Sequence, residues 1–435
     1  MSTLAKGSKK LLNAWAFYDW ANSVYPLVIS SSIFPLYYGF LFPKENPYLL
    51  FLGFEFKSTA LISFVTAFAF LCVAFFSPLL SGIADFAGNK KRFMQFFCYL
   101  GALSCIGMYW FTSDNIYFGI VCFFFGLLGF WGSLVFYNSY LPDIAFKEQQ
   151  DSLSAKGYSF GYVGSVILLL INLYMILGKE GEEAMHAMRL AFAMTGIWWI
   201  LFAQYAFYYL PKGNKNAEKI TKDVVLNGFR ELRKVQIHLC QNLILYRYLV
   251  AFFVYSMAVQ TVMLVATYFG EQEINWAGDS EKTSGLIISI LVIQLVAVLG
   301  ATLTSKASEK FGNIPTLIFV NTIWAIICVF AYFVTEPIHF YLTAGFVGLV
   351  MGGIQALSRS TYSKFLPKTD DTASYFSFYD VAEKIGIVIG MVIYGLIDQI
   401  TGSMRNAIVF LGVFFVAGLI LLLRVPKNAV IEKMD

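Results

Sequence analysis

The stretch NAWAFYDWANSVYPLVISSSIFPLYYGFL, residues 13–41, decides how this chain folds. At about 1.5 Å per residue, a helix of this length crosses a bilayer with some tilt. It contains Asp19, and a carboxylate in a spanning helix is costly unless it faces a protein interior or a wet cavity. Helical spacing places further residues on the face of Asp19, namely Asn22, Ser23, Pro26 and Ser30. Because this stripe of polar residues continues toward the middle of the span, we expect Asp19 to face the interior of a helix bundle. The alternative is that Asp19 lies in the headgroup region and only orients the helix.

The composition indicates a polytopic membrane protein. Of 435 residues, 58% are hydrophobic and only 13% are charged, which excludes an ordinary soluble domain. Apolar runs of membrane length alternate with short polar segments, so we predict an all-α protein of twelve transmembrane helices. The predicted spans are residues 13–41, 58–83, 93–112, 115–138, 158–177, 189–210, 248–269, 283–305, 315–335, 339–362, 375–397 and 405–424.

The basic residues are segregated by this topology. Most of the 31 Lys and Arg residues fall on the side that carries both termini. The other side carries only Lys44, Lys57, Lys179, Arg189, Lys282 and Arg405. The positive-inside rule therefore predicts that both termini are cytoplasmic. The N-terminal segment MSTLAKGSKK lacks a cleavable secretory pattern, so we expect the first span to be retained.

Several function classes find no support in the sequence. The six cysteines lie in spans or on the cytoplasmic side, and the three histidines are scattered, so we expect neither disulfides nor a metal site and no cofactor. The basic residues flank membrane spans, which argues against nucleic-acid binding. We found no catalytic motif and expect no enzyme. The expected partners are a small-molecule substrate and the lipid bilayer, with protons as a candidate coupling ion, and we expect a monomer.

An internal repeat divides the chain into two halves. Gly88-Asn89 recurs as Gly312-Asn313, an offset of 224 (88 to 312), and Pro142 recurs as Pro367, an offset of 225 (142 to 367). Two near-equal offsets from separate loops indicate two homologous six-span units. We predict an N-terminal bundle over residues 1–210, a linker over 211–247 and a C-terminal bundle over 248–435.

The linker carries apolar residues spaced among charges, which predicts an amphipathic helix along the cytoplasmic membrane face. The apolar residues are Val225, Phe229, Leu232, Ile237 and Leu239. A plain tether explains such a helix, and a regulatory contact is the alternative.

The segment SGIADFAGNKKR, residues 81–92, resembles the loop signature G-x-x-x-D-x-x-G-[RK]-[RK] of the major facilitator superfamily. In that family the aspartate meets a neighbouring helix end and the bases hold the inward gate shut. The resemblance assigns such a gate to Asp85, Gly88, Lys90, Lys91 and Arg92. Asn89 departs from the signature by replacing its first base. The alternative is a basic anchor that only fixes topology.

Further stretches resemble one branch of this superfamily, the vacuolar amino-acid effluxer-like family, whose bacterial members are called the unknown major facilitator family. They are AFYDWANS (16–23), YNSYLPDIA (137–145), SAKGYSFGYVGS (154–165), WWILF (198–202) and GGIQALSRSTYSKFLP (352–367). The chain departs from the family in span 7, where YSMAVQT (255–261) lacks the acid of Y-N-D-G-x-Q-T. The resemblance implies the major facilitator fold, transport of small solutes and, for a bacterial member, the inner membrane.

Ionisable residues inside the predicted spans concentrate near residues 355–384. On span 11, Asp380 precedes Lys384 by four residues, so the two can pair within one helix. Glu383 then needs another cation, and we expect Arg359 of span 10 to pair with it across the connecting hairpin. Such pairs either form and break as a gate or fix the hairpin permanently.

Asp19 is our candidate for proton coupling, because the sequence places no cation near it. Other polar residues on span faces are candidates for lining a cavity: Asn22, Ser23, Asn138, Tyr158, Tyr162, Tyr255, Gln260, Gln355, Ser358 and Tyr379. Asp19 and Glu383 offer negative charge to an amino group, and Arg359 and Lys384 offer positive charge to a carboxylate or phosphate.

Together these features predict a secondary transporter that moves a small polar or zwitterionic, amino-acid-like solute by alternating access. An exporter or flippase of amphiphiles is one alternative, favoured by the 18% aromatic content. A receptor derived from a transporter is the other.

Overall fold

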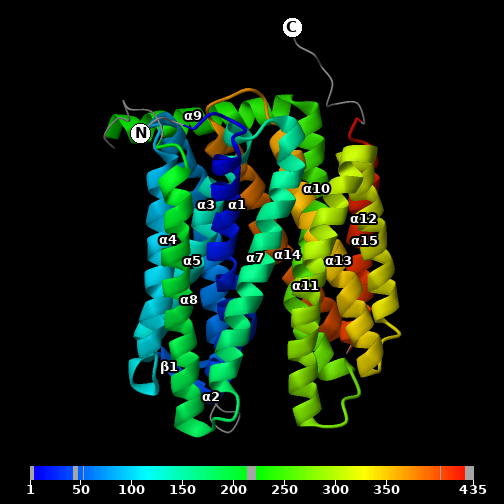
Figure 1. The fold of residues 1–435 in the computed structure, drawn as a ribbon. Coiled ribbons are helices and arrows are strands. Elements are labelled where there is room, and N and C mark those ends of the chain that lie inside the picture. The colour runs from blue at the N-terminus through cyan, green and yellow to red at the C-terminus, as the bar shows by residue number, and fades with distance from the viewer. Residues whose placement is uncertain (1–3, 43–47, 52, 213–221, 402, 427–435) are drawn as a thin grey trace.

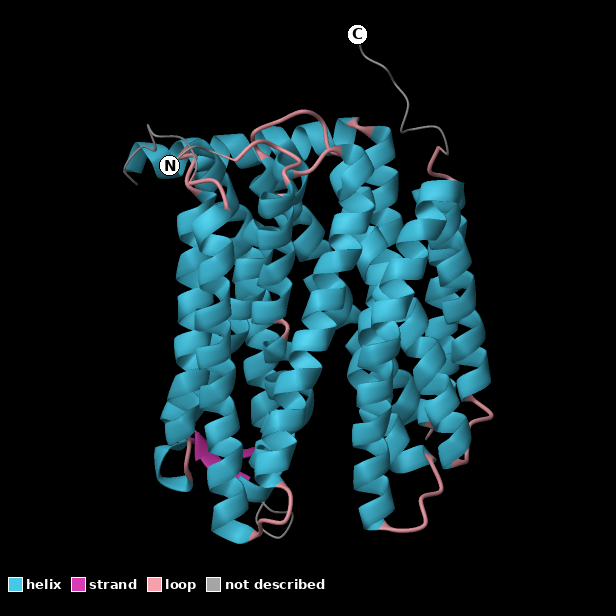
Figure 2. Cartoon of the chain, viewed as in Figure 1, coloured by secondary structure: helices cyan, strands magenta, loops and turns pink. Residues whose placement is uncertain are grey.

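A computed structural model describes residues 4–42, 48–51, 53–212, 222–401 and 403–426. Long helices dominate it, with one short hairpin, β1–β2 (Figures 1 and 2). The elements up to the linker are α1 (Lys9–Asn22), η1 (Tyr25–Ile33), α2 (Phe34–Leu41), β1 (Tyr48–Phe51), β2 (Phe54–Lys57), α3 (Ser58–Phe86), α4 (Lys90–Gly107), η2 (Met108–Trp110), η3 (Ser113–Asn115), α5 (Ile116–Ser139), α6 (Leu141–Ile144), α7 (Lys147–Ile176) and α8 (Gly181–Tyr209). The remaining elements are α9 (Lys222–Gln241), α10 (Leu243–Glu273), α11 (Asp279–Phe311), α12 (Asn313–Ala331), α13 (Pro337–Phe365), α14 (Thr372–Thr401) and α15 (Met404–Leu423).

The helices match the predicted spans in order. Within the described part of the chain, eleven segments are long and apolar enough to cross a membrane. The remaining predicted span, residues 375–397, corresponds to α14, which has 30 residues but carries Asp380, Glu383 and Lys384 near its middle. The predicted all-α class is confirmed. The antiparallel hairpin β1–β2 was not predicted.

The first predicted span is not one regular helix. It consists of α1, the π-helical segment η1 and α2. Pro26 lies at the start of η1 and Pro35 at the start of α2. Proline removes a backbone donor and clashes with the preceding turn, which explains a change of helical geometry at these points. The α-helix that carries Asp19 therefore ends at Asn22, and the π-helical segment begins at Tyr25.

The start of α1, the end of α15 and helix α9 lie at the same end of the molecule (Figure 1). We call this end the terminal side and the opposite end the far side. Buried residues form two large clusters. One draws almost entirely on residues 11–210, and the other on residues 235–425 with Tyr162 added. The domain boundaries at 210 and 248 remain a prediction.

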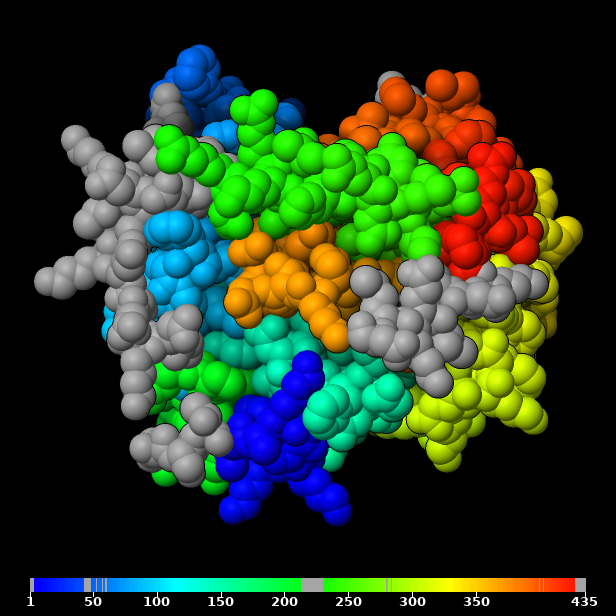
Figure 3. All heavy atoms as spheres, turned by 90° about the horizontal axis from the view of Figure 1, so that it is seen from above, coloured from blue at the N-terminus to red at the C-terminus, as the bar shows by residue number. Residues whose placement is uncertain are grey.

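Helix α9 lies across the terminal side (Figure 3), where it packs on α3, α10 and α14. It therefore contacts helices from both clusters. Val235 and Leu239 are buried, whereas Ile237 is 48% exposed. The expected apolar face is thus wrong at Ile237 and omitted Val235, and the side chains of Val225 and Phe229 lie outside the described part. In the described part of α9, the apolar residues Val235 and Leu239 pack against protein, in contrast to the membrane contact that we expected.

Candidate functional site

Asp19 of α1 and Arg359 of α13 form an ion pair inside the molecule. Both Nη atoms of Arg359 lie 3.3 Å from Oδ2 of Asp19. Arg359 is 2% exposed and Asp19 is 4% exposed. The expectation that Asp19 has no nearby cation is therefore wrong, and so is the expected pairing of Arg359 with Glu383. Burial against Arg359 also rules out the headgroup position considered for Asp19.

The guanidinium of Arg359 is almost fully coordinated. Its Nε donates to Ser154 Oγ (2.9 Å) and its Nη2 to the Ser154 carbonyl (3.0 Å). Its Nη1 also donates to Oδ1 of Asn138 at 3.3 Å, which places this predicted residue at the ion pair. Asp19 Oδ2 accepts a further bond from the Tyr137 hydroxyl at 2.9 Å. These donors and acceptors offset the cost of burying two charges.

Aromatic rings enclose the same guanidinium. Its carbon lies 4.2 Å from the ring centre of Tyr158, 4.8 Å from that of Trp15 and 5.5 Å from that of Tyr137. A cation over aromatic faces gains electrostatic attraction where water is excluded. Gly157 permits this packing, because a Cβ there would lie 2.4 Å from Asp19 Oδ2. The pair thus ties α1 and α7 of one cluster to α13 of the other.

The other residues of the predicted polar stripe do not contact Arg359 directly. Asn22 is buried, and its amide nitrogen has no hydrogen-bond partner in the described structure. Ser23 lies against Gly161 of α7, where an added Cβ would lie 2.3 Å from its hydroxyl oxygen. Pro26 is half-buried and Ser30 is exposed. Exposure along the stripe therefore increases from Asp19 toward the far side.

A second charged cluster lies on α14. Lys384 Nζ is 3.0 Å from Asp380 Oδ1 and 2.7 Å from Glu383 Oε2. The Asp380–Lys384 pair predicted from the spacing is confirmed. Glu383 also accepts a hydrogen bond of 2.8 Å from Nε2 of Gln260 in α10. The ammonium of Lys384 lies 3.5 Å from the ring centre of Trp131 in α5, so this cluster too contacts both halves.

A small pocket lies between the two charged clusters. Its polar lining consists of residues that we proposed from the sequence together with Ser256: Tyr158, Tyr255, Ser256, Gln260, Gln355, Ser358, Tyr379 and Glu383. Its apolar lining is Phe252, Val259 and Ile354. Tyr158 comes from the N-terminal half and the other lining residues from the C-terminal half. The predicted residue Tyr162 is not among the lining residues, but its hydroxyl donates to Oε1 of the lining residue Gln355 at 2.7 Å.

Asp85 forms one of the contacts between the two halves on the terminal side. Its carboxylate accepts bonds from the backbone N–H groups of Ala373 (3.2 Å) and Ser374 (2.7 Å) and from the Ser374 hydroxyl (2.7 Å). These groups belong to the first turn of α14, where a negative charge is stabilised by the helix dipole. Gly88 follows with a φ of 63°, a left-handed conformation that favours glycine.

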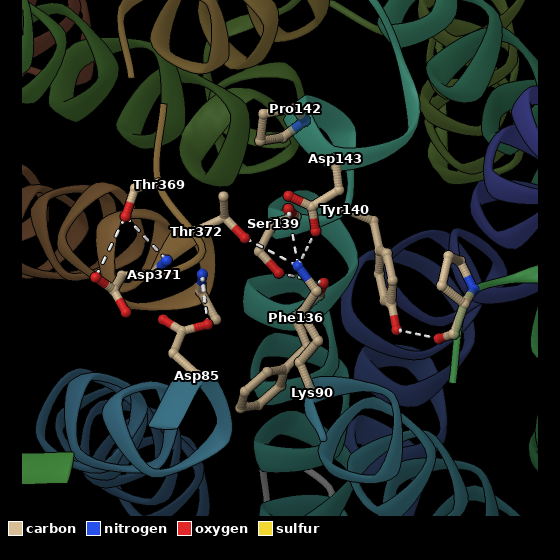
Figure 4. Close-up of polar contacts among 12 residues, drawn as sticks. Asp85, Lys90, Phe136, Ser139, Tyr140, Pro142, Asp143, Thr369, Asp371 and Thr372 are labelled. Atoms are coloured by element: carbon tan, nitrogen blue, oxygen red, sulfur yellow. Dashed lines mark hydrogen bonds and ion pairs between the residues drawn. The ribbon is translucent and has the colours of Figure 1, made fainter. Parts of the chain in front are cut away.

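The three predicted gate bases have different contacts. Lys90 pairs with Asp143 and donates to Thr372 Oγ1 at 2.9 Å (Figure 4), so it reaches across to the start of α14. Lys91 donates to the carbonyl of Leu210 at 2.8 Å, within its own half. Arg92 is exposed. Among the three, Lys90 has the geometry of a gate residue.

Asp151 of α7 makes the reciprocal contact, which we did not predict. It accepts from Ser308 Oγ (3.0 Å) and Asn313 Nδ2 (2.9 Å) at the turn between α11 and α12, and it pairs with Lys364. Asp85 lies at the end of the second span and meets the start of the eleventh. Asp151, in the same half, lies near the start of the fifth span and meets the end of the eighth. The internal repeat could have identified this position, since it aligns the starts of α7 and α14.

The described residues include no group of three or more His, Cys, Asp or Glu side chains suited to a metal ion. The arrangement is a polar pocket between two helical halves, closed toward the terminal side by Asp19–Arg359, by Asp85 and by Asp151. The pocket encloses about 20 Å³ in this conformation, room for about one water. Such an arrangement can bind a small solute when the halves move apart, and can then exchange its access between two sides.

Comparison with known proteins agrees with this geometry. Residues 7–433 match the family described as "Vacuole effluxer Atg22 like". The chain is 30% identical to the uncharacterized MFS-type transporter YxiO of Bacillus subtilis, over 98% of this chain and 97% of that protein. It is 24% identical to autophagy-related protein 22 of Eremothecium gossypii over 61% of this chain, and it spans 54% of that protein.

The fold is also that of a solved transporter. The proton:xylose symporter XylE, with 13% identity, superimposes with a TM-score of 0.70 over 96% of each chain. The major facilitator fold predicted from the sequence is thereby confirmed, and the similar proteins are transporters rather than enzymes. The chain belongs to the vacuole effluxer Atg22-like family of major facilitator transporters.

Proposed function

We propose that this transporter moves a small polar solute that carries an ammonium group, with amino acids as the substrate class, by alternating access. The observation that carries the proposal is the pocket that contains Glu383. Among the described residues that line the pocket, this carboxylate is the one charged group, and hydroxyl and amide groups surround it. A carboxylate among neutral donors and acceptors suits an ammonium group with polar neighbours.

The charge assignment differs from the one that we expected. Arg359 and Lys384 were candidates for holding a substrate carboxylate. Both are buried, and neither lines the pocket in this conformation. Arg359 contacts the pocket through the ring of Tyr158. We therefore assign anchoring of the substrate to Glu383, and assign its remaining polar atoms to Gln260, Gln355 and the hydroxyls of Tyr255 and Ser358.

The terminal side is proposed to face the cytoplasm of a bacterial cell, with the chain acting as a monomer in the inner membrane. The distribution of Lys and Arg supports this orientation. In the conformation described here, access from the terminal side is closed. Transport then requires the contacts of Asp19, Asp85 and Asp151 with the opposite half to break together and re-form in each cycle.

The pocket gives less support to an amphiphile transporter. Phe252, Val259 and Ile354 are its only apolar lining residues within the described structure. Most exposed aromatic and aliphatic side chains lie elsewhere on the helices, as expected for surfaces that face lipid.

The experiment compares matched ligands on the purified protein. Amino acids should raise the melting temperature, because a ligand that binds the folded state stabilises it. Their N-acetyl derivatives, which lack the ammonium group, should not. Ligands found in this way are then tested by counterflow in liposomes, using Gln260→Ala and a control, Gln204→Ala, which alters an exposed glutamine of α8. Equal stabilisation by acetylated and free amino acids, or equal counterflow by both variants, would overturn the proposal.

A further inference from the structure

The cluster on α14 carries an unbalanced charge. Asp380 and Glu383 contribute two negative charges, and Lys384 contributes one positive charge. The Asp19–Arg359 pair is balanced by comparison. Lys384 has a fully buried side chain, and the side chain of Asp380 is 8% exposed. A net charge held at this depth is costly, so it favours neutralisation by a bound ion.

One carboxylate oxygen in the cluster accepts no hydrogen bond, although the Ser77 hydroxyl lies beside the carboxyl. Both oxygens of Glu383 are occupied, Oε1 by Gln260 and Oε2 by Lys384. Asp380 uses Oδ1 for Lys384, whereas its Oδ2 is buried without a hydrogen-bond partner. A proton on this atom would neutralise the cluster without displacing an existing donor. Protonating Glu383 would displace one, and protonating Asp19 would weaken its bonds with Tyr137 and Arg359.

The groups that face Asp380 come from both halves. Its own helix supplies Glu383 and Lys384, and Ser77 of α3 lies beside the carboxyl. Helix α5 contributes the ring of Trp131 over Lys384, and α10 contributes Gln260 through Glu383.

Charged groups on the other elements packed against α14 are engaged at the ends of the molecule. Asp85 of α3 binds the first turn of α14, Glu231 and Lys234 pair on α9, and Arg405 of α15 pairs with Glu273 of α10. The described charged groups that act on Asp380 are therefore Glu383 and Lys384.

We propose that Oδ2 of Asp380 binds one proton while the terminal side is closed and releases it to water when that side opens. An O–H bond forms on the carboxylate, which makes the cluster neutral, and the same bond breaks when α14 separates from Ser77 and Trp131. Glu383 on the next helical turn faces the solute at the same time. The inference rests on the proposed transport function for its coupling role, and it assigns proton coupling to α14 in place of Asp19.

Infrared difference spectroscopy across a pH titration tests the protonation step without any substrate. We expect a protonated-carboxyl band in the wild type that is lost in Asp380→Asn and retained in Asp19→Asn and in the control Glu273→Gln. Ser77→Ala is a milder variant that should shift the band by removing a neighbouring hydroxyl. A band that persists in Asp380→Asn, a band lost only in Asp19→Asn, or no carboxyl band at all would overturn the proposal. So would sodium-dependent, pH-independent stabilisation that Asp380→Asn abolishes.

Liposomes with a pH-sensitive dye inside test the coupling role. With an amino-acid mixture, Asp380→Asn should retain counterflow but lose accumulation driven by a proton gradient. Gradient-driven accumulation by this variant at the wild-type level would refute the coupling role. Absence of counterflow in the wild type would instead refute the proposed function, and the infrared result would still decide the protonation step.

Discussion

Replacing Asp19 with asparagine is expected to shift the molecule away from the conformation in which the terminal side is closed. The substitution keeps the size of the side chain but removes its negative charge. Arg359 would then be a buried cation that donates hydrogen bonds to Ser154 and Asn138 but has no counter-ion. It remains buried, at 2% exposure, as long as the halves stay together.

The magnitude follows from the environment of this pair. Removing one partner of a buried ion pair costs about 3–5 kcal/mol. Because Ser154, Asn138 and three aromatic rings still surround the guanidinium, we take the lower end, about 3 kcal/mol. That corresponds to a shift of roughly two orders of magnitude in the closed-to-open ratio. The double variant Asp19→Asn/Arg359→Gln should recover part of the lost preference for the closed conformation, since it leaves no unpaired buried charge.

Distances between spin labels provide the assay. Labels at cysteines introduced for Ser152 of α7 and Glu309 of α11 report the separation of the halves, because both positions are exposed near the terminal side. The distance distribution should lengthen in Asp19→Asn. The control Glu273→Gln breaks the ion pair between α10 and α15 within one half and should leave the distribution unchanged. An unchanged distribution in Asp19→Asn, with the protein folded, would refute the reasoning.

Two further predictions use matched pairs of residues, and a third compares one variant with the wild type across pH. Gly157→Ala should lower thermal stability by about 1–3 kcal/mol through overpacking, because its Cβ would lie 2.4 Å from Asp19 Oδ2. The control Gly395→Ala places its Cβ in open space. Equal melting temperatures of the two variants would contradict this prediction. Asp85→Ala should destabilise the folded protein by about 1–2 kcal/mol, because it removes the hydrogen-bond acceptor for the first turn of α14. Glu309 is exposed at the equivalent position of the repeat, so Glu309→Ala should have little effect. Chemical unfolding of both variants tests this prediction. Burial, and to a smaller extent the Glu231 carboxylate, raises the pKa of Asp371 above its usual value. The stability that protonated Asp371 contributes is therefore present at acidic pH and is lost as pH rises through the raised pKa. Asp371→Asn should therefore be more stable than wild type at neutral pH and equal to it at acidic pH in a melting series, and a difference independent of pH would disprove this.

Local patterns predicted the features that depend on one helix. The four-residue spacing of Asp380 and Lys384 predicted an ion pair that the structure confirms. The polar stripe after Asp19 predicted a protein interior, and Asp19 is buried there. The span boundaries followed from hydrophobic runs, because burial in lipid constrains the sequence continuously over each helix.

Contacts between distant helices could not be read in the same way. Arg359 pairs with Asp19 across 340 positions, whereas sequence proximity favoured Glu383 on the neighbouring span. Asp151 was missed because it stands in a polar segment, residues 147–152, that resembles an ordinary loop. The π-helical geometry after Pro26 was also missed, since a proline signals a distortion but does not define its type.

The central claim is that transport requires the halves to separate on the terminal side. Ala155 of α7 and Ala301 of α11 lie in one buried cluster at this contact, and cysteines at these two positions can be joined by a short thiol crosslinker. In liposomes, crosslinking should abolish counterflow of amino acids, and cleaving the linker should restore it, while the same treatment of a protein with only its native cysteines has no effect. Undiminished counterflow by fully crosslinked protein would contradict the account.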